Sequence, residues 1–197
     1  MAPKNKVPKG WLGCPNNGIR LIESKFMPLK TPLSTNFDSK LGPDDWFHPR
    51  DIFDLAKKNK VKFGLWIDLT NTDRYYLRDE IENQNCDYKK LSCQGHGTLP
   101  TFRFVNQFFH LVEKFVWNNP YSCIAIHCTH GYNRTGFLIV SFLVEKLNYY
   151  VDDAVRLFAE LRPPGIYRHE YVVELFRRYG DIRDAPPPIA KPSWSKD

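Results

Sequence analysis

The sequence lacks the features that would point to a membrane or to an oxidising compartment. Its 197 residues contain no apolar run long enough to cross a bilayer and no signal-peptide pattern. Its five cysteines are odd in number and irregularly spaced, which does not fit a disulfide framework. They are Cys14, Cys86, Cys93, Cys123 and Cys128. We therefore expect free thiols, a reducing compartment and no membrane contact.

Clustered glutamates, which metal-dependent phosphate chemistry uses, are also scarce. Glu80-Ile81-Glu82 is a single pair and is typical of a solvated face. We expect no metal and no organic cofactor. The chain does carry an excess of positive charge, with a formal net charge of +6 at pH 7, which favours a polyanionic partner.

The most informative segment runs from His127 to Gly136, because it places a cysteine and an arginine at the two ends of a loop that can wrap a phosphate. The apolar run Ser122–Ile126 precedes this segment, and the apolar-periodic stretch Phe137–Leu147 follows it. This pattern predicts a turn from a strand into a helix. An anion held there would face unpaired N–H groups and the positive end of the helix dipole.

The residue types in this loop suit attack on a phosphate. Cys128, at a helix N-terminus, is expected to have a lowered pKa and to act as a thiolate nucleophile. Arg134 offers a planar fork of donors that can clamp phosphate oxygens in the transition state. Thr135 can hydrogen-bond the sulfur, and His127 can orient the loop from behind. The residues between are predicted to bind the substrate: Thr129, His130, Gly131, Tyr132 and Asn133.

A lone cysteine after a strand is more often a core residue than a nucleophile. Here, however, the chain matches a longer pattern of His-Cys, five residues, Arg, and then Ser or Thr. That pattern is typical of the cysteine-dependent phosphatases, and it lies at the strand-to-helix junction that the chemistry requires.

Strands and helices alternate along the chain. The hydrophobic patterns predict buried strands and amphipathic helices. The strands are expected at Val61–Thr70, Tyr88–Cys93 and Ser122–Ile126, and the helices at Pro49–Asn59, Thr101–Asn118, Arg134–Asn148, Asp152–Leu161 and Arg168–Tyr179. This alternation predicts an α/β fold with a central, mostly parallel, twisted sheet flanked by helices. The resemblance of the loop to that of the cysteine-dependent phosphatases implies the cysteine-phosphatase fold. The phosphate-binding loop would lie between a central strand and a helix. We expect one catalytic domain over residues 1–184 and a Pro-rich tail or linker over residues 185–197.

The stretch about thirty residues before Cys128 bears on which phosphate is cleaved. Phosphatases that act on phosphotyrosine or phosphoserine generally place an aspartate general acid there, to protonate a poor leaving group. Residues 93–100 contain no aspartate. A phosphate leaving group is more stable as an anion than a tyrosine phenoxide by about 4 pKa units, roughly 5 kcal/mol. The sequence therefore favours a phosphoanhydride substrate.

Two kinds of residue remain as alternative acids. One is His96 or another residue distant in the sequence. The other is Asp68, at the end of its predicted strand, whose alternative role is to satisfy nearby backbone groups.

Along nearly its full length, the chain resembles the amino-terminal RNA 5′-triphosphatase domain of metazoan mRNA-capping enzymes. The matching segments are Trp11–Pro15, Val61–Thr72, Gly95–Gly97, His127–Phe137, Arg162–Tyr167 and Glu174–Ile182. The resemblance implies removal of the γ-phosphate from the 5′-triphosphate end of nascent RNA through a phosphocysteine on Cys128, without a metal. It also implies a nuclear protein.

The same resemblance implies a guanylyltransferase domain C-terminal to this one, with its lysine in a Lys-x-Asp-Gly motif. This sequence has no such motif, so residues 185–197 are expected to be an interdomain linker. The phosphorylated tail of RNA polymerase II is a further implied partner, associated mainly with the second domain.

Basic residues outside the loop could bind other parts of the substrate. Arg162 and Arg168 flank Pro163-Pro164-Gly165, a rigid turn that could face the loop, and we expect both to contact substrate phosphates. Lys89, Lys90, Arg177 and Arg178 are more typical of solvated surface.

Two alternative functions remain open. A dual-specificity protein phosphatase or a phosphoinositide phosphatase would share the fold and the loop, although phosphoinositide phosphatases tend to carry lysines inside the loop. A non-catalytic phosphate-binding module is an alternative of another class. The presence of both Cys128 and Arg134 argues against it.

Overall fold

The fold is built on one four-stranded sheet. The computed structural model describes residues 6–95 and 97–195. The strands are β1 (Phe26–Leu29), β2 (Phe63–Asp68), β3 (Asp87–Lys90) and β4 (Cys123–His127). Their order across the sheet is β1-β4-β2-β3, and every neighbouring pair is parallel. The loop that follows β4 therefore leaves the carboxyl end of a central strand, as the sequence predicts.

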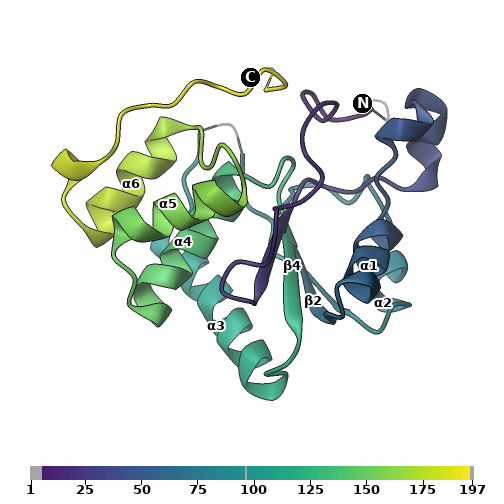
Figure 1. The fold of residues 1–197 in the computed structure, drawn as a ribbon, viewed down its shortest axis with the longest axis horizontal. Coiled ribbons are helices and arrows are strands. Elements are labelled where there is room, and N and C mark those ends of the chain that lie inside the picture. The colour runs from purple at the N-terminus through teal and green to yellow at the C-terminus, as the bar shows by residue number, and fades with distance from the viewer. Residues whose placement is uncertain (1–5, 96, 196–197) are drawn as a thin grey trace.

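Helices cover both faces of the sheet (Figure 1). They are α1 (Pro49–Lys58), α2 (Asp79–Glu82), α3 (Phe102–Asn118), α4 (Asn133–Leu147), α5 (Val151–Leu161) and α6 (His169–Tyr179). Short 3-10 turns occupy Thr35–Lys40, Pro43–Asp45 and Ile182–Asp184. Helices α1 and α2 pack on one face, and α3 to α6 pack on the other (Figure 1). The predicted α/β class and the parallel sheet are thereby confirmed.

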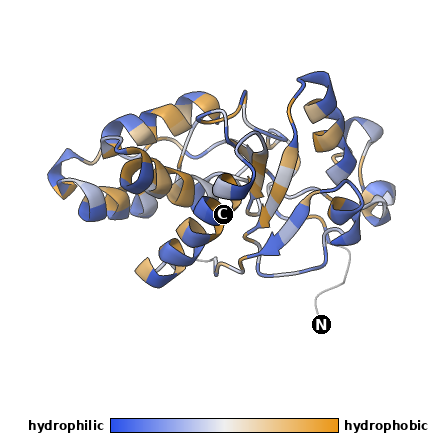
Figure 2. Cartoon of the chain, turned by 90° about the horizontal axis from the view of Figure 1, so that it is seen from below, coloured by the Kyte–Doolittle hydropathy of each residue, from blue (hydrophilic) through white to orange (hydrophobic). Residues whose placement is uncertain are grey.

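Each face of the sheet buries its own hydrophobic core. The larger core joins β2 and β4 to α3, α4, α5 and α6, and the smaller one joins the opposite face to α1 and α2. Viewed from below, apolar residues on the helices and strands gather toward the interior (Figure 2). The apolar faces by which the sequence predicts the helices are therefore the faces that pack against the sheet and form these two cores.

Helix α4 runs through the larger core. Its residues Leu138, Ile139 and Val140 are consecutive and completely buried, so the helix is apolar on all sides. It packs against β1, α3, α5 and α6. Because α4 is enclosed in this way, its N-terminal end, where the phosphate loop enters, has a fixed position.

Helix α3 shows how local sequence sets a boundary. The Thr101 side chain accepts a hydrogen bond from the Phe104 N–H at 3.2 Å, which caps the first turn. On the apolar face of α3, Phe108 and Phe115 are buried, and Phe104 and Leu111 are partly buried against the same core. This face of α3 therefore packs in the larger core.

Strand β1 was not predicted from the sequence, because Pro28 lies in its middle. A central strand forms backbone hydrogen bonds with neighbouring strands on both sides, and proline has no N–H to donate to either of them. Here β1 is an edge strand that pairs with β4 alone among the strands, with Pro28 opposite Ile126. An edge position tolerates the missing donor.

The described part of the tail, residues 185–195, runs from α6 back toward the N-terminal segment (Figure 1). The Trp194 ring lies against three aromatic rings, with centroid distances of 5.3 Å to His130, 5.1 Å to Tyr132 and 5.6 Å to Tyr167. This stretch therefore packs on the domain and contacts the phosphate loop. Within the described ranges, no helix combines the length and the apolar character that crossing a bilayer requires.

Candidate active site

The loop between β4 and α4 lies unusually close to β1. Gly131 has a φ of +75°, and a Cβ atom there would stand 1.9 Å from the carbonyl oxygen of Leu29. Only glycine can make this left-handed turn at such a short distance. No side chain caps the start of α4 at Asn133. The loop and the first turn of α4 therefore present N–H groups that an anion can accept.

The Cys128 thiol is buried within this loop and is surrounded by groups that favour its ionised form. Burial raises the pKa of Cys128, but the Arg134 charge and hydrogen bonds from Thr135 and Gly131 outweigh it and lower the pKa below its usual value. The Gly131 N–H donates to the sulfur at 3.3 Å. The buried Thr135 hydroxyl, for which the described residues offer no other partner, lies beside the same sulfur. The sulfur can therefore be a thiolate near neutral pH.

The Arg134 guanidinium is held in place by oxygens from three segments. Its Nη1 donates to the carbonyl of Cys93 at 2.8 Å and to that of Leu69 at 3.3 Å, and its Nη2 donates to Thr129 Oγ1 at 3.0 Å. These neutral partners fix the fork without cancelling its charge. The guanidinium is thus positioned to bind a dianion before the anion arrives.

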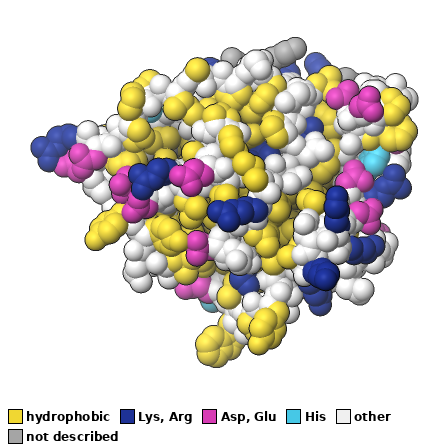
Figure 3. All heavy atoms as spheres, in the orientation of Figure 1, with side chains coloured by type: hydrophobic (Ala, Val, Ile, Leu, Met, Phe, Trp, Pro, Cys, Tyr) yellow, Lys and Arg dark blue, Asp and Glu magenta, His cyan; other side chains and the backbone are white. Residues whose placement is uncertain are grey.

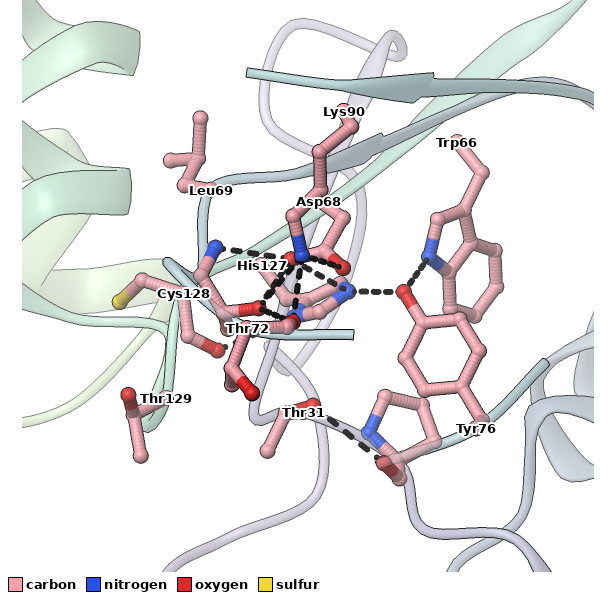
Figure 4. A network of polar contacts seen from close by, with 12 residues as sticks. Thr31, Trp66, Asp68, Leu69, Thr72, Tyr76, Lys90, His127, Cys128 and Thr129 are labelled. Carbon is pink, nitrogen blue, oxygen red and sulfur yellow. Dashed lines mark hydrogen bonds and ion pairs between the residues drawn. The ribbon is translucent and has the colours of Figure 1, made fainter. Parts of the chain in front are cut away.

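His127 supports the loop from behind through a chain of hydrogen bonds (Figure 4). Its Nδ1 lies 3.0 Å from the Cys128 carbonyl, which can only accept, so Nδ1 carries the proton. Burial lowers the pKa of His127, which keeps the ring neutral and leaves Nε2 as an acceptor. Tyr76 Oη donates to that Nε2 at 2.6 Å and accepts from Trp66 Nε1 at 3.0 Å. The hydrogen bonds that link Trp66, Tyr76 and His127 fix the tautomer of the His127 ring, and the ring in turn orients the Cys128 carbonyl.

Asp68 acts in the same network and not as an acid in the pocket (Figure 4). Its Oδ1 accepts from the Thr70 N–H and hydroxyl, each at 2.7 Å, and its Oδ2 accepts from Tyr88 Oη and Lys90 Nζ, each at 2.9 Å. Burial raises the pKa of Asp68, but the charge of His127 when its ring is protonated, the charge of Lys90, and hydrogen bonds from Lys90 and Thr70 outweigh it and hold the pKa below its usual value. A buried carboxylate with these four donors is a poor proton donor at neutral pH. The alternative role, satisfying nearby groups, is the one that the structure supports.

The phosphate loop opens onto a cavity of about 290 Å³ at the carboxyl end of the sheet. Its lining residues are Pro8, Lys9, Arg74, Tyr75, Gly95, Cys128, Thr129, His130, Asn133, Arg134, Tyr167, Arg168 and Tyr171. Of the residues predicted from the loop, Thr129, His130 and Asn133 line this cavity together with Cys128 and Arg134. Arg168 lines it from the turn before α6, as the sequence predicts.

Three residues predicted to bind substrate lie outside this lining. Gly131 takes part through its backbone N–H, as described above. The Tyr132 side chain is completely buried, and its hydroxyl donates to the Pro163 carbonyl at 3.0 Å. Arg162, at 1% exposure, is also buried. The expectation that Arg162 contacts substrate is therefore corrected.

Arg162 instead holds the loop to the N-terminal segment. Its Nη2 donates to the carbonyls of Pro15 at 2.8 Å and His130 at 2.9 Å, and its guanidinium carbon lies 4.3 Å from the centre of the Tyr132 ring. These contacts join the phosphate loop, at His130 and Tyr132, to the N-terminal segment at Pro15.

Asn133 also has a structural contact that the sequence does not reveal. Its Oδ1 accepts from the N–H groups of Tyr167 at 3.1 Å and Arg168 at 3.0 Å. This ties the first residue of α4 to the turn that carries Arg168. The Arg168 guanidinium itself lies 3.7 Å from Glu170 Oε1.

Sequence reasoning missed Lys9, Arg74 and Tyr75, which line the cavity from segments far from the loop in sequence. None of them belongs to a motif, so no local signal could have identified them. The more conspicuous basic residues are engaged elsewhere. Lys90 bonds to Asp68, while Arg177 and Arg178 both pair with Glu174.

The charges of the cavity are all of one sign. Lys9, Arg74, Arg134 and Arg168 line it, and no aspartate or glutamate does among the described residues. On the face seen in Figure 3, by contrast, basic and acidic side chains are interspersed. His96 lies outside the described residues. No group of three or more His, Cys, Asp or Glu side chains that could hold a metal occurs in residues 6–95 and 97–195.

Comparison with known proteins places this geometry in a family. The family model for the catalytic domain of dual specificity phosphatases matches residues 49–179. The mRNA-capping enzyme of Mus musculus is 48% identical over 190 residues, which cover 96% of this chain and 32% of that protein. The RNA/RNP complex-1-interacting phosphatase homolog of Caenorhabditis elegans is 35% identical over 187 residues, which cover 90% of this chain and 80% of that protein. The chain spans about a third of the length of the mRNA-capping enzymes it matches.

Solved structures agree on the fold. The G95A form of the phosphatase Tk-PTP superposes with a TM-score of 0.63 at 17% identity, over 86% of this chain and 95% of that one. PTPMT1 superposes with a TM-score of 0.61 at 15% identity, over 83% of this chain and 95% of that one. At such low identities the likeness extends to the fold alone.

Proposed function

Since this chain belongs to the family of dual specificity phosphatase catalytic domains, we propose that it is an RNA 5′-triphosphatase that works through a phosphocysteine. It removes the γ-phosphate from the triphosphate end of RNA and leaves a diphosphate end. The relatives named mRNA-capping enzymes, which this chain matches over nearly its whole length, support this choice of substrate within the family.

The observation that carries the proposal is the composition of the pocket. It combines a Cys128 thiol of lowered pKa and the Arg134 clamp with further cations, and the described lining contains no carboxylate. A pocket without a carboxylic acid suits a leaving group that departs as an anion. The β-phosphate of a triphosphate is such a group, and a tyrosine or serine oxygen is not.

In the first step the Cys128 thiolate attacks the γ-phosphorus. The sulfur–phosphorus bond forms as the bond from the γ-phosphorus to the bridging oxygen breaks, and that oxygen departs with the diphosphate end as an anion. Arg134 and the N–H groups of the loop bind the equatorial oxygens, where charge is concentrated in the transition state. No proton needs to be delivered to the leaving group.

In the second step water hydrolyses the phosphocysteine. An oxygen–phosphorus bond forms, the sulfur–phosphorus bond breaks, and inorganic phosphate leaves with the proton of the water passing to phosphate or solvent. The Thr135 hydroxyl, which lies beside the Cys128 sulfur, stabilises the returning thiolate. The Trp66–Tyr76–His127 chain keeps the loop in place during both steps.

The partners and location follow from the same proposal. The chain matches only part of each mRNA-capping enzyme, in line with a further domain beyond residue 197 in the complete protein. A guanylyltransferase domain would use the diphosphate end as its substrate. Activity on nascent mRNA would place the protein in the nucleus, where the phosphorylated tail of RNA polymerase II is a further candidate partner.

A second candidate is a free-standing phosphatase like the RNA/RNP complex-1-interacting phosphatases. This chain covers 80% of the Caenorhabditis elegans homolog, compared with 32% of the Mus musculus mRNA-capping enzyme. The two candidates share the chemistry of the pocket. They differ in whether another domain receives the product.

The test compares leaving groups under metal-free conditions. The protein is incubated in EDTA with γ-labelled triphosphate-ended RNA, with a phosphotyrosine peptide and with a phosphoinositide, beside a Cys128→Ser variant. We expect phosphate release from the RNA, little release from the other two, and none from the variant. Trapping in acid should recover label on Cys128.

Three results would contradict the proposal. One is loss of RNA turnover in EDTA, and another is retention of turnover by Cys128→Ser. The third is faster turnover of the phosphotyrosine peptide or the phosphoinositide than of RNA, which would favour an ester phosphatase. Binding of RNA without any turnover would indicate a non-catalytic module.

A further inference from the structure

The pocket carries more positive charge than a single phosphate requires. A phosphate monoester brings a charge of about −1.5 to −2 at neutral pH. The loop N–H groups and Arg134 already complement it at the Cys128 sulfur. Lys9, Arg74 and Arg168 add three more cations to the same lining, and none of the described lining residues is acidic. Arg168 lies near Glu170, which leaves Lys9 and Arg74 as the cations that suit a ligand with additional anionic groups.

Lys9 is carried by a firmly packed part of the N-terminal segment. The Lys9 carbonyl accepts from His130 Nε2 at 2.8 Å, which fastens it to the phosphate loop. Two residues further on, the Trp11 side chain is completely buried and donates from Nε1 to the Thr31 carbonyl at 2.7 Å. The backbone is therefore anchored at Lys9 itself and at Trp11, while the Lys9 side chain is exposed at the pocket.

Arg74 lines the same pocket from the segment between β2 and α2. Its Nη2 donates to Tyr75 Oη at 3.1 Å, and its guanidinium carbon lies 5.0 Å from the centre of that ring. Tyr75 is buried, and its carbonyl accepts from the Ser34 N–H at 2.7 Å. The buried ring thus supports the exposed guanidinium at the mouth of the pocket.

Among the described residues, no carboxylate neutralises either of these two charges. Across residues 6–95 and 97–195, Lys9 and Arg74 form no ion pair with an acidic side chain. Arg78, Arg156 and Arg183, which lie elsewhere on the surface, each pair with a carboxylate. Two unpaired cations from separate segments, both facing one pocket, form an anion subsite.

We propose that Lys9 and Arg74 bind the phosphates that follow the reacting one in the substrate. This inference rests on the proposed function, because it takes the γ-phosphate to lie at Cys128 and extends the RNA end from there. Lys9 acts as a point charge and Arg74 as a planar fork. The pocket thereby selects substrates with consecutive phosphates over those with one. The contacts are electrostatic and so independent of base sequence.

The test uses Lys9→Gln, Arg74→Gln and the double variant, with Lys58→Gln as the matched control. Lys58 is an exposed lysine on α1 that does not line the pocket. Because Lys9 and Arg74 are also exposed, their loss should leave the fold intact, which circular dichroism and thermal melting will verify. Kinetics are measured with triphosphate-ended RNA and with para-nitrophenyl phosphate, which has a single phosphate.

We expect the double variant to raise KM for RNA about tenfold, with kcat changed less than twofold, since exposed charge contacts contribute modestly. Turnover of para-nitrophenyl phosphate should stay within twofold of the unchanged protein. The slope of log KM against log salt for RNA should fall by roughly 0.7 for each phosphate contact removed. The Lys58→Gln variant should match the unchanged protein in all three.

Binding separates this inference from the proposed function. The dissociation constant of triphosphate-ended RNA is measured in the Cys128→Ser background, with and without the double substitution, beside RNA that ends in a 5′-hydroxyl. The subsite requires a larger loss for the triphosphate end than for the hydroxyl end, whether or not turnover is observed.

Any of four outcomes would overturn the inference. The first is a KM for RNA within twofold of the unchanged protein. The second is an equal loss for RNA and para-nitrophenyl phosphate. The third is an equal loss of binding for the two RNA ends, which would show general attraction to RNA. Binding of phosphoinositide vesicles that depends on Lys9 and Arg74, without binding of RNA, would also overturn it.

Discussion

Cys128 differs from the other buried thiols near it in the direction of its pKa shift. Burial raises the pKa of Cys14 and of Cys93, each to about 11, because neither has enough compensating charge. At Cys128 the same penalty is outweighed by Arg134, Thr135 and Gly131. Burial alone therefore does not determine whether a thiol here is reactive. The nearby positive charge and hydrogen-bond donors determine it.

This difference predicts site-selective alkylation. Between pH 6 and 8, Cys128 should react with iodoacetamide faster than Cys14 and Cys93, because its pKa is lowered while theirs are raised to about 11, against a free-thiol pKa of about 8.5. Replacing Arg134 with Met removes the main lowering influence, so the pH midpoint of alkylation should rise. Mass spectrometry of each cysteine against pH measures both effects. A midpoint for Cys128 at or above that of a free thiol would contradict the thiolate assignment.

Asp68 provides a second prediction, for stability. Breaking a buried ion pair typically costs about 3–5 kcal/mol, so Asp68→Asn should lower the free energy of unfolding by roughly 3 kcal/mol at pH 7. Asp73→Asn is the control, because Asp73 also pairs with Lys90 but is 88% exposed, and it should cost less than about 1 kcal/mol. Urea unfolding of both variants measures the difference.

The pH dependence of this effect has a definite sign. The pKa of Asp68 is lower in the folded state, so its stabilisation is fully present above the unfolded-state pKa of about 3.9. It is lost as the pH falls through the folded-state value. The gap between the unchanged protein and Asp68→Asn should therefore shrink below about pH 4. A gap that stays constant down to acid pH would contradict the proposed role of the carboxylate.

The role of a residue was predictable from the sequence where it belongs to a motif made of residues close to it in the chain. Cys128 and Arg134 lie in one loop, so their spacing alone identifies them. Tyr76, which orients His127, has no such context, and neither have Lys9 and Arg74. For Arg162 the sequence predicted a substrate contact that is wrong. Its place beside a Pro-Pro-Gly turn is visible in the sequence, but its burial is not. These positions depend on tertiary packing between distant segments.

At the scale of elements, the turn from β4 into α4 depends on glycine for two separate reasons. Gly131 has a positive φ and also lies against β1, whereas Gly97 has a φ of +87° with nothing within 4 Å of its would-be Cβ. Gly97→Ala should therefore cost about 1–2 kcal/mol, for backbone strain alone. Gly131→Ala adds a collision with the Leu29 carbonyl, so the loop must move.

We expect Gly131→Ala to lower the free energy of unfolding by about 2 kcal/mol more than Gly97→Ala does, in the range of overpacked sites. It should also abolish the binding of inorganic phosphate, because the displaced loop no longer aims its N–H groups at one point. Chemical denaturation and isothermal titration with phosphate measure the two effects. Equal costs for the two glycines, with phosphate binding kept, would show that the loop is not pinned against β1.

The elements that sequence patterns predicted are those with a periodic apolar face. Helices α1, α3, α4, α5 and α6 end within a few residues of their expected positions, and β2, β3 and β4 were each anticipated. The short helix α2 (Asp79–Glu82) and the strand β1 escaped prediction for different reasons. Helix α2 is too short to show a period, and Pro28 hides β1.

At the scale of the whole molecule, the two ends of the described chain meet at the phosphate loop. The N-terminal segment reaches it through Lys9 and His130, and the tail reaches it through Trp194. The sequence predicted a tail that cannot form a core, and composition gave no reason to expect an anchored tryptophan. Whether residues 185–197 also link to a second domain stays a prediction.

The contact of the tail leads to a fourth prediction. Trp194→Ala removes ring contacts with His130, Tyr132 and Tyr167, and aromatic contacts contribute about 0.5–1.5 kcal/mol each beyond burial. We expect a loss of about 1–2 kcal/mol of unfolding free energy and a raised KM for substrate. Trp117→Ala, at a site 88% exposed, serves as the control and should change stability by less than about 0.5 kcal/mol. Similar melting temperatures for the two variants would rule out an anchoring role.

The one-signed charge of the pocket also affects the protein when it is empty. Lys9, Arg74 and Arg134 carry like charges around one cavity, so the arrangement that serves binding works against folding. An anion that binds only the folded state raises the free energy of unfolding by mass action, in proportion to the logarithm of the anion concentration once the site is mostly occupied. The melting temperature of this domain should therefore depend on the anions in the buffer. Substrate and phosphate ions stabilise the folded domain by binding to the same pocket in which catalysis takes place.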